Sequence, residues 1–145
     1  MSEAERTSAG LVERFLEASM IPDPMRAREF MALDVRITFT GGRRYGDPSE
    51  SAAFNALRYR WVTKRFERTD VVSDAAAREA IVYSTGTLYG EWPDGRCFEG
   101  NGYVDRFVIR GGKIVRMDVW NDSCPCRKLK PAHNGDAVRQ EPVAR

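Results

Sequence analysis

The stretch NGYVDRFVIRGGKIVRMDVW, residues 101–120, places the strongest limit on the fold. Large apolar residues alternate with polar ones on both sides of Gly111-Gly112, which is the pattern of two antiparallel strands joined by a tight turn. Because successive side chains of a strand point to opposite faces, the hairpin has one apolar face and one polar face. The chain must therefore build a sheet whose apolar side is covered by other elements.

The turn allows two registers. A two-residue turn places Asp105 opposite Asp118, and like charges in that position are destabilising. A three-residue turn with Gly112 left-handed places Asp105 opposite Met117 and leaves Arg106 opposite Arg116 on the solvated face. We favour the three-residue turn, which predicts one consistent inner row consisting of Tyr103, Asp105, Phe107, Val115, Met117, Val119 and Asn121.

The rest of the chain predicts helices first and strands last. Helical spacing and capping residues indicate a helix over 11–20, a second from Pro24 to about Leu33 with Asp23 as its N-cap, and a third that Ser49 or Ser51 caps. The third helix is expected to carry Phe54, Leu57, Trp61 and Val62. Alternation predicts strands at 35–40, 66–73, 79–91, 97–109 and 113–122, and turn-forming residues predict a loop over 41–51.

These elements predict the α+β class: a cone-shaped, curved antiparallel β-sheet with three helices packed on its concave face. Short turns between the last four strands require antiparallel pairing. Glycines inside the long strands, at positions 86, 90, 100 and 102, predict bulges or bends that curl the sheet. A curled sheet covered by helices encloses an apolar hollow of the kind that binds small ligands.

The composition favours one globular domain over residues 1–122 and a basic tail over 123–145. The 145 residues are 42% hydrophobic and 30% charged, and the net charge of +2 comes from the tail. No basic face with interleaved aromatics indicates nucleic-acid binding, and no apolar run of about 18 residues indicates a membrane span. The N-terminus lacks the pattern of a secretory signal, so we expect a cytoplasmic protein.

The cysteines do not predict a disulfide framework. Cys97, Cys124 and Cys126 are odd in number, and with His133 they lack the spacing of a structural zinc site. No phosphate-binding loop, G-x-S-x-G or H-E-x-x-H sequence is present. We therefore expect no metal and no cofactor.

Asp105 is the candidate catalytic residue because it stands among aromatic and aliphatic neighbours in a row whose other polar member is Asn121. Loss of hydration disfavours the charged form of a carboxyl group and raises its pKa, so that it can transfer a proton or donate a hydrogen bond near neutral pH. An equally weighted alternative is an aspartate tied to a buried arginine, tyrosine or backbone amide for structural reasons.

The order of elements over about residues 8–122, with YVDRFVIRGGKIVRMDVW as the closing hairpin, resembles the NTF2-like superfamily and especially its SnoaL-like isomerases and polyketide cyclases. The resemblance implies a cone-shaped domain, a pocket at its open end and a homodimer through the outer sheet face. It also implies that Asp105 matches the oxyanion-hole aspartate of ketosteroid isomerases. The tyrosine and general base of those isomerases fall at Phe15 and Phe39, and the last-strand aspartate of the similar epoxide hydrolases falls at Val119.

Two functions are consistent with this reading. The first is an isomerase or cyclase that moves a proton on a small apolar carbonyl compound, and the second is a non-catalytic ligand-binding or protein-interaction module. Trp120, on the outer face, is either part of the subunit interface or a single exposed aromatic. The residues expected to line the ligand pocket are Phe15, Phe39, Trp61, Tyr83, Tyr103, Phe107, Met117, Val119 and Asn121.

Overall fold

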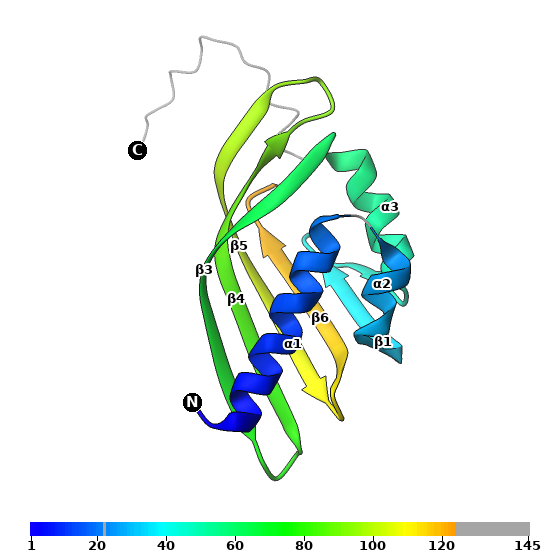
Figure 1. Cartoon of the computed structure of the whole chain (residues 1–145). Helices are drawn as coiled ribbons and strands as arrows, with labels where there is room; N and C mark the ends of the chain where they lie inside the picture. Colours follow the sequence, from blue (N-terminus) through cyan, green and yellow to red (C-terminus); the bar gives the residue numbers. More distant parts are fainter. Residues whose placement is uncertain (22, 124–145) are drawn as a thin grey trace, which may run out of the picture.

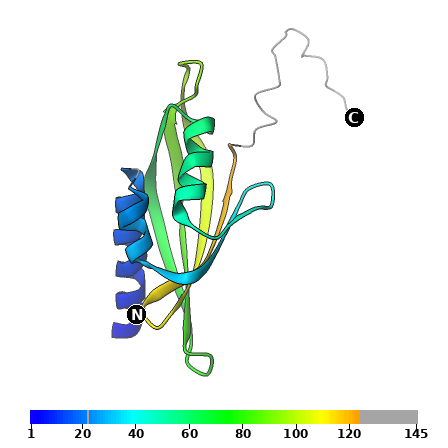
Figure 2. The same ribbon diagram turned by 90° about the vertical axis from the view of Figure 1, so that its right-hand side faces the viewer.

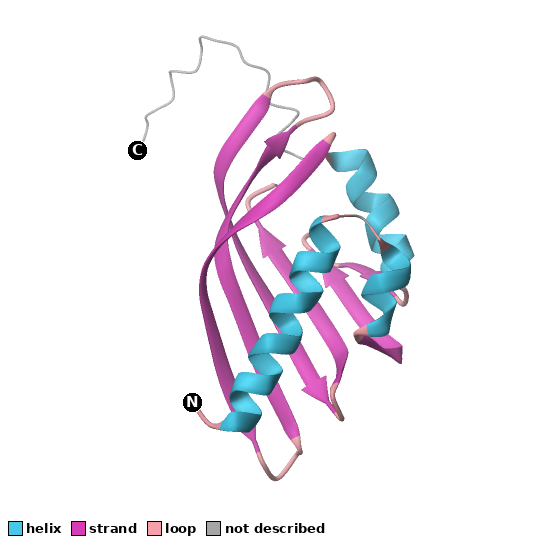
Figure 3. Ribbon diagram, viewed as in Figure 1, coloured by secondary structure: helices cyan, strands magenta, loops and turns pink. Residues whose placement is uncertain are grey.

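The computed structural model describes residues 1–21 and 23–123. The expected tail, with Cys124, Cys126 and His133, therefore lies outside the described residues except for Ser123. The described residues form three helices and six strands, which confirms the α+β class (Figure 1, Figure 3). Their order is α1 (Glu3–Met20), α2 (Pro24–Glu29), β1 (Met31–Phe39), β2 (Arg43–Tyr45), α3 (Pro48–Arg58), β3 (Trp61–Asp74), β4 (Glu79–Glu91), β5 (Cys97–Arg110) and β6 (Lys113–Asn121).

The strands form one curved sheet in the order β2-β1-β6-β5-β4-β3. Strands β3 to β6 make the expected antiparallel meander, whereas β1 pairs with β6 in parallel, so the sheet is not antiparallel throughout. The parallel pair is possible because the chain between these two strands is long enough to cross over. Helix α1 lies across the concave side, and α2 and α3 lie beside β1, as the two perpendicular views show (Figure 1, Figure 2).

Helix α1 begins earlier than its apolar residues indicate. Ser2 and Glu5 form a capping box, in which each side chain accepts a hydrogen bond from the backbone N–H of the other residue, so the helix starts at Glu3. Asp23 caps α2 as predicted, but this helix ends at Glu29 rather than at about Leu33. Met31 instead pairs with Ile114 of β6, so residues 31–33 belong to the first strand.

The segment after β1 also differs from its prediction. Residues 43–45 form the short strand β2, although a loop was expected there. Asp47, and not Ser49 or Ser51, caps α3 by accepting a hydrogen bond from the backbone N–H of Ser49. The helix ends at Arg58, so Trp61 and Val62 start strand β3 instead of ending the helix.

The register of the closing hairpin combines parts of both alternatives. Arg110 pairs with Lys113, which makes the turn a two-residue Gly111-Gly112 turn, and an irregularity between Val108 and Ile109 shifts all later pairs by one residue. The extra residue lies in β6 between Ile114 and Arg116, the partners of Ile109 and Val108. The three-residue turn that we favoured is therefore wrong.

The shift changes the partners of both aspartates. Asp105 lies opposite Val119 rather than Met117, and Arg106 lies opposite Asp118 rather than Arg116. The guanidinium of Arg106 donates to Asp118 at 3.1 Å, so the outer face gains an opposite-charge pair where we expected two arginines.

Two of the glycines in the long strands have different roles. Gly100 has a φ of 82° and is the unpaired residue of a bulge between β4 and β5, as expected. Gly86 is fully paired, but a Cβ atom there would overlap the backbone carbonyl oxygen of Arg65 in β3. Glycine at position 86 thus permits a close approach of two strands rather than a bulge.

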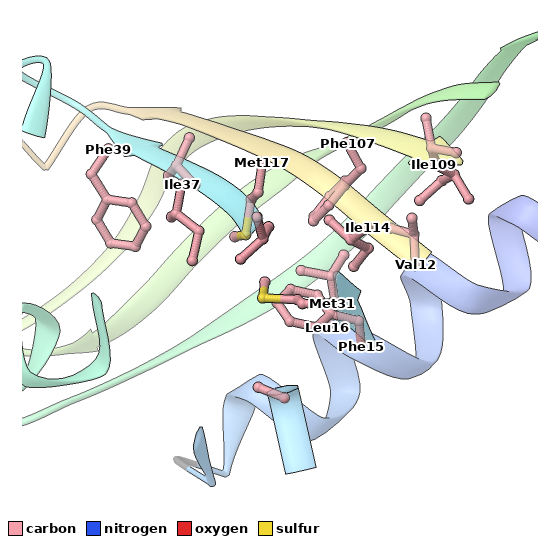
Figure 4. Packing of buried hydrophobic residues seen from close by; sticks show 14 residues of the cluster. Val12, Phe15, Leu16, Met31, Ile37, Phe39, Phe107, Ile109, Ile114 and Met117 are labelled. Carbon is pink, nitrogen blue, oxygen red and sulfur yellow. The ribbon is translucent and has the colours of Figure 1, made fainter. Parts of the chain in front are cut away.

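The hydrophobic core lies between α1 and the concave face of the sheet (Figure 4). Phe107 of β5 is completely buried and packs edge-to-face against Phe15 of α1, with their ring centroids 5.7 Å apart. Ile114 is also completely buried, whereas Val115, which we expected in the inner row, is half-buried. Several members of this core, among them Phe15, Phe39 and Met117, also line a cavity between the helices and the sheet, so the core continues into the wall of that cavity.

Candidate functional site

A cavity of about 470 Å³ lies between the helices and the sheet. Its wall is formed by the C-terminal half of α1, by α2, by α3, by the first residues of β3 and by inner residues of β1, β4, β5 and β6. Most of the lining side chains are apolar, among them Phe15, Leu16, Leu88 and Met117. The size and composition are those of a site for a small organic molecule.

Asp105 lies in the wall of this cavity. Its position on β5, between the inner residues Tyr103 and Phe107, directs its side chain to the concave side, opposite Ser84 of β4 and Val119 of β6. The residue has 0% of its surface exposed, and neither Oδ1 nor Oδ2 accepts a hydrogen bond from any residue that the structure describes. A buried acceptor without a partner is rare in folded proteins and needs a specific explanation.

Lys64 of β3 is the ionic partner of Asp105. Its Nζ lies 2.8 Å from Oδ2 of Asp105, and only 16% of the lysine side chain is exposed. The same Nζ lies 3.7 Å from the centroid of the Tyr103 ring, which is a cation–π contact. An ammonium group has three donors, so Lys64 can also donate to an acceptor in the cavity.

Burial raises the pKa of the Asp105 carboxyl group above its ordinary value, because desolvation penalises the charged form. The positive charge and the hydrogen bond of Lys64 oppose this shift without cancelling it. Burial also raises the pKa of the Tyr103 hydroxyl to about 12, against the hydrogen bond that it forms with Ser84. Tyr103 therefore stays neutral near pH 7, while Asp105 is a stronger base than a solvated aspartate.

No family model and no curated protein matches the sequence. Solved structures do match: an NTF2-like protein of Burkholderia thailandensis E264 has 19% identity and a TM-score of 0.68, over 85% of this chain and 97% of that chain. A protein of Jannaschia sp. CCS1, provisionally named a SnoaL-like polyketide cyclase, has 20% identity and a TM-score of 0.64, over 84% and 90% of the two chains.

This chain has the NTF2-like fold. A third match, an NTF2-like protein of Novosphingobium aromaticivorans, has 15% identity and a TM-score of 0.61, covers 80% of each chain and is described as having a cystatin-like fold. The architecture that the resemblance implied is therefore confirmed.

Seven of the residues predicted for the site lie in the wall of the NTF2-like cavity. They are Asp105, Phe15, Phe39, Trp61, Met117, Val119 and Asn121. Trp61 is at the edge of the cavity, because its side chain is 48% exposed and its ring packs edge-to-face against Tyr89. The side-chain oxygen of Asn121 already accepts a hydrogen bond from the backbone N–H of Ser123.

The other three predicted residues do not line the cavity. Phe107 belongs to the core, and Tyr103 lies beside the Lys64–Asp105 pair with its hydroxyl on Ser84. Tyr83 is on the wrong face: Val82 and Ser84 point inward, so Tyr83 points outward and pairs with Arg106. Its placement in the pocket is a wrong prediction, because strand β4 carries apolar residues on both faces and the alternation does not reveal which face is buried.

Lys64 is the functional candidate that sequence reasoning missed. It alternates with Val62 and Phe66, a pattern that places it on the inner face of a strand. We expected Val62 on a helix and the strand to begin at residue 66, so Lys64 was not assigned to the inner face of a strand. If the strand is taken to start at Trp61, the sequence shows Lys64 between the apolar residues Val62 and Phe66 on one face, just as it shows Asp105 between Tyr103 and Phe107.

The outer face of the sheet carries a second group of charges. Asp118 is buried between Arg106, at 3.1 Å, and Arg116, at 2.9 Å. Trp120 lies next to this group with 51% of its surface exposed, opposite Val104, which is also exposed. The predicted position of Trp120 on the outer face is confirmed.

Within residues 1–21 and 23–123, no group of three or more histidine, cysteine, aspartate or glutamate side chains is arranged to hold a metal ion. In the same ranges, none of the helices combines the length and the hydropathy that crossing a membrane requires.

Proposed function

We propose that the cavity binds a small, largely apolar carbonyl compound and that Asp105 transfers a proton to and from it, as in a SnoaL-like isomerase or cyclase. The observation that carries this proposal is the completely buried carboxyl group with a free oxygen in the wall of an apolar cavity. Groups whose environment perturbs their pKa inside a cleft are frequent acid–base catalysts.

Proton transfer at the carbon next to a carbonyl group requires a base close to that carbon, and Asp105 is the proposed base. The carboxylate of Asp105 removes a hydrogen from the carbon next to the carbonyl group, the C–H electrons form a C=C bond, and the carbonyl oxygen becomes an enolate. If the compound also has a C=C bond between its β and γ carbons, the protonated Asp105 then returns the proton to the γ carbon, which moves the double bond and isomerises the compound. Alternatively, the enolate carbon attacks a second carbonyl of the same molecule and closes a ring, and the protonated Asp105 gives its proton to the resulting alkoxide. The raised pKa of Asp105 makes it a stronger base for the first step.

The structural neighbours are in keeping with this class of ligand. Some of them are provisionally named polyketide cyclases, and TerC, with 14% identity over 85% of this chain, was co-crystallised with polyporic acid. Likeness at this level supports the fold, so the proposal for this chain rests on its own Asp105.

Deuterium exchange tests the proposal without knowledge of the natural substrate. The protein is incubated in D₂O with a panel of enolisable ketones and lactones, and loss of the α-hydrogen signal is followed by NMR. We expect exchange above the buffer rate for at least one cyclic compound, and a loss of about 100-fold or more in Asp105→Asn. Asp118→Asn is the matched control, since it also removes a buried carboxylate, but on the outer face.

The second candidate is a binding module without catalysis. The observation that favours it is that Phe15 and Phe39 line the cavity, since the resemblance puts the tyrosine of the isomerases at Phe15 and their general base at or near Phe39. In this case the protein binds members of the panel but does not exchange their hydrogens. Full exchange activity in Asp105→Asn would also remove the catalytic role from this residue.

The proposal includes a homodimer through the outer face of the sheet. Exposed Trp120 and Val104 lie there beside the Arg106–Asp118–Arg116 group, and an aromatic flanked by arginines is typical of subunit interfaces.

A further inference from the structure

We propose that Lys64 is a second catalytic residue, which holds the oxygen of an enolate while Asp105 holds the proton, and that the substrates are compounds with an acidic hydrogen next to a carbonyl group. The inference rests on the proposed function and extends it, because it assigns a role to Lys64 and a chemical pattern to the ligand.

The donors and acceptors of the pair carry the argument. Nζ of Lys64 forms an ion pair with Oδ2 of Asp105 at 2.8 Å and lies over the Tyr103 ring. Neither carboxylate oxygen of Asp105 has a hydrogen-bond partner among the described residues. A buried ammonium group beside a carboxylate whose oxygens lack hydrogen bonds fits a ligand that offers an acceptor beside a hydrogen.

An enolisable carbonyl compound has this pattern. Its oxygen accepts from Lys64 while its α-hydrogen meets Oδ1 of Asp105, so the two groups act on neighbouring atoms. When the proton moves to Asp105, the negative charge moves from the carboxylate to the ligand oxygen, and Lys64 stays in contact with that charge. A fixed cation in a dry cavity stabilises such a developing charge far more than water-exposed lysine does.

The other described residues that face Asp105 carry no positive charge that could stabilise an enolate oxygen. The strands on either side place Ser84 and Val119 opposite Asp105, and Phe15 and Leu16 of α1 are apolar. The hydroxyl of Tyr103 is hydrogen-bonded to the hydroxyl of Ser84, and the negative charge of Glu67 contributes to the raised pKa of Tyr103. Among the described residues, Lys64 is the cation that forms an ion pair with Asp105.

The first experiment measures binding with two matched probes. 4-Hydroxycoumarin is an enolate in neutral solution, and coumarin has the same rings and carbonyl group without the acidic hydroxyl. We expect the unmodified protein to bind 4-hydroxycoumarin at least about tenfold more tightly, because a charge-assisted hydrogen bond to Lys64 is available to its oxygen. Equal affinity for the two probes, or no binding of either, overturns the role of Lys64 whatever the variants do.

Variants of Lys64 and Arg65 test whether Lys64 causes the preference for 4-hydroxycoumarin over coumarin. Lys64→Met should abolish the preference for 4-hydroxycoumarin, and Lys64→Gln serves the same purpose should methionine prevent folding. Arg65→Met is the matched control, because Arg65 is the next residue of β3, is exposed and lies over Tyr89 on the other face. A preference that survives loss of Lys64, or that disappears in Arg65→Met as well, contradicts the assignment.

The exchange rate separates catalysis by Lys64 from an indirect effect on Asp105. Without Lys64 the pKa of Asp105 rises further, so the exchange profile moves to higher pH in either case. If Lys64 stabilises the enolate, the rate at the high-pH plateau stays about 100-fold below that of the unmodified protein. Recovery of the full plateau rate in the Lys64 variant would show that Lys64 only positions Asp105, and would overturn the proposal. Absence of exchange in the unmodified protein would instead overturn the proposed function, and the binding test would then decide the role of Lys64.

Discussion

Removing Lys64 should cost stability in a strongly pH-dependent way. Lys64→Met leaves the carboxyl group of Asp105, which has 0% exposure, without its ionic partner. Breaking a buried ion pair in this manner typically costs about 3–5 kcal/mol. The cost has a ceiling, however, because Asp105 can take up a proton instead of remaining charged.

The ceiling follows from the ordinary pKa of aspartate, about 3.9. Protonating such a group costs about 1.4 kcal/mol for each pH unit above that value, which gives about 4 kcal/mol at pH 7 and about 1.5 kcal/mol at pH 5. The sign follows from linkage: the folded state has the raised pKa and binds the proton more tightly, so the free energy of unfolding falls as pH rises from about 3.9 through the folded pKa. The penalty of Lys64→Met should therefore shrink by more than half between pH 7 and pH 5.

Urea unfolding at the two pH values measures this penalty. The double variant Lys64→Met/Asp105→Leu is the control, since replacing both charges by apolar groups should restore most of the lost stability at pH 7. A penalty that is equal at pH 5 and pH 7, or a double variant that is no more stable than Lys64→Met, would show that Asp105 is not a buried, lysine-paired acid.

Three further predictions concern the fold and the assembly. Gly86→Ala should lower the free energy of unfolding by about 1–3 kcal/mol because its Cβ overlaps the facing carbonyl of β3, whereas Gly46→Ala, with open space around it, should have little effect in the same urea titration. Phe107→Ala should cost about 3–5 kcal/mol, far more than Val104→Ala on the exposed face; similar losses for both would place the core elsewhere. Sedimentation should show a dimer at micromolar concentration that Trp120→Glu converts to a monomer, and a monomeric unmodified protein would refute the outer-face interface.

The closing hairpin shows which parts of the fold the sequence predicts. Alternation along 103–109 correctly placed Asp105 inside and Arg106 outside, because that alternation is strict. The partners of these residues could not be predicted, since the bulge in β6 has no glycine or other residue type that marks it. Gly100 is the contrasting case, where a glycine at positive φ does mark the bulge.

The site was only partly predictable for a related reason. Trp61 and Val62 continue the apolar spacing of α3, so the helix and the strand could not be separated by periodicity, and Lys64 was missed with them. Tyr83 was assigned to the wrong face because strand β4 has large apolar residues at both odd and even positions.

Titration of Asp105 shows whether its carboxyl group is a buried acid at a ligand site. In protein labelled with ¹³C at the aspartate carboxyl groups, the signal that disappears in Asp105→Asn identifies this residue. We expect it to titrate clearly above the ordinary value of about 3.9 and to shift when 4-hydroxycoumarin binds. A carboxyl group that titrates at or below that value and does not respond to the ligand would contradict the account of a buried acid at a ligand site.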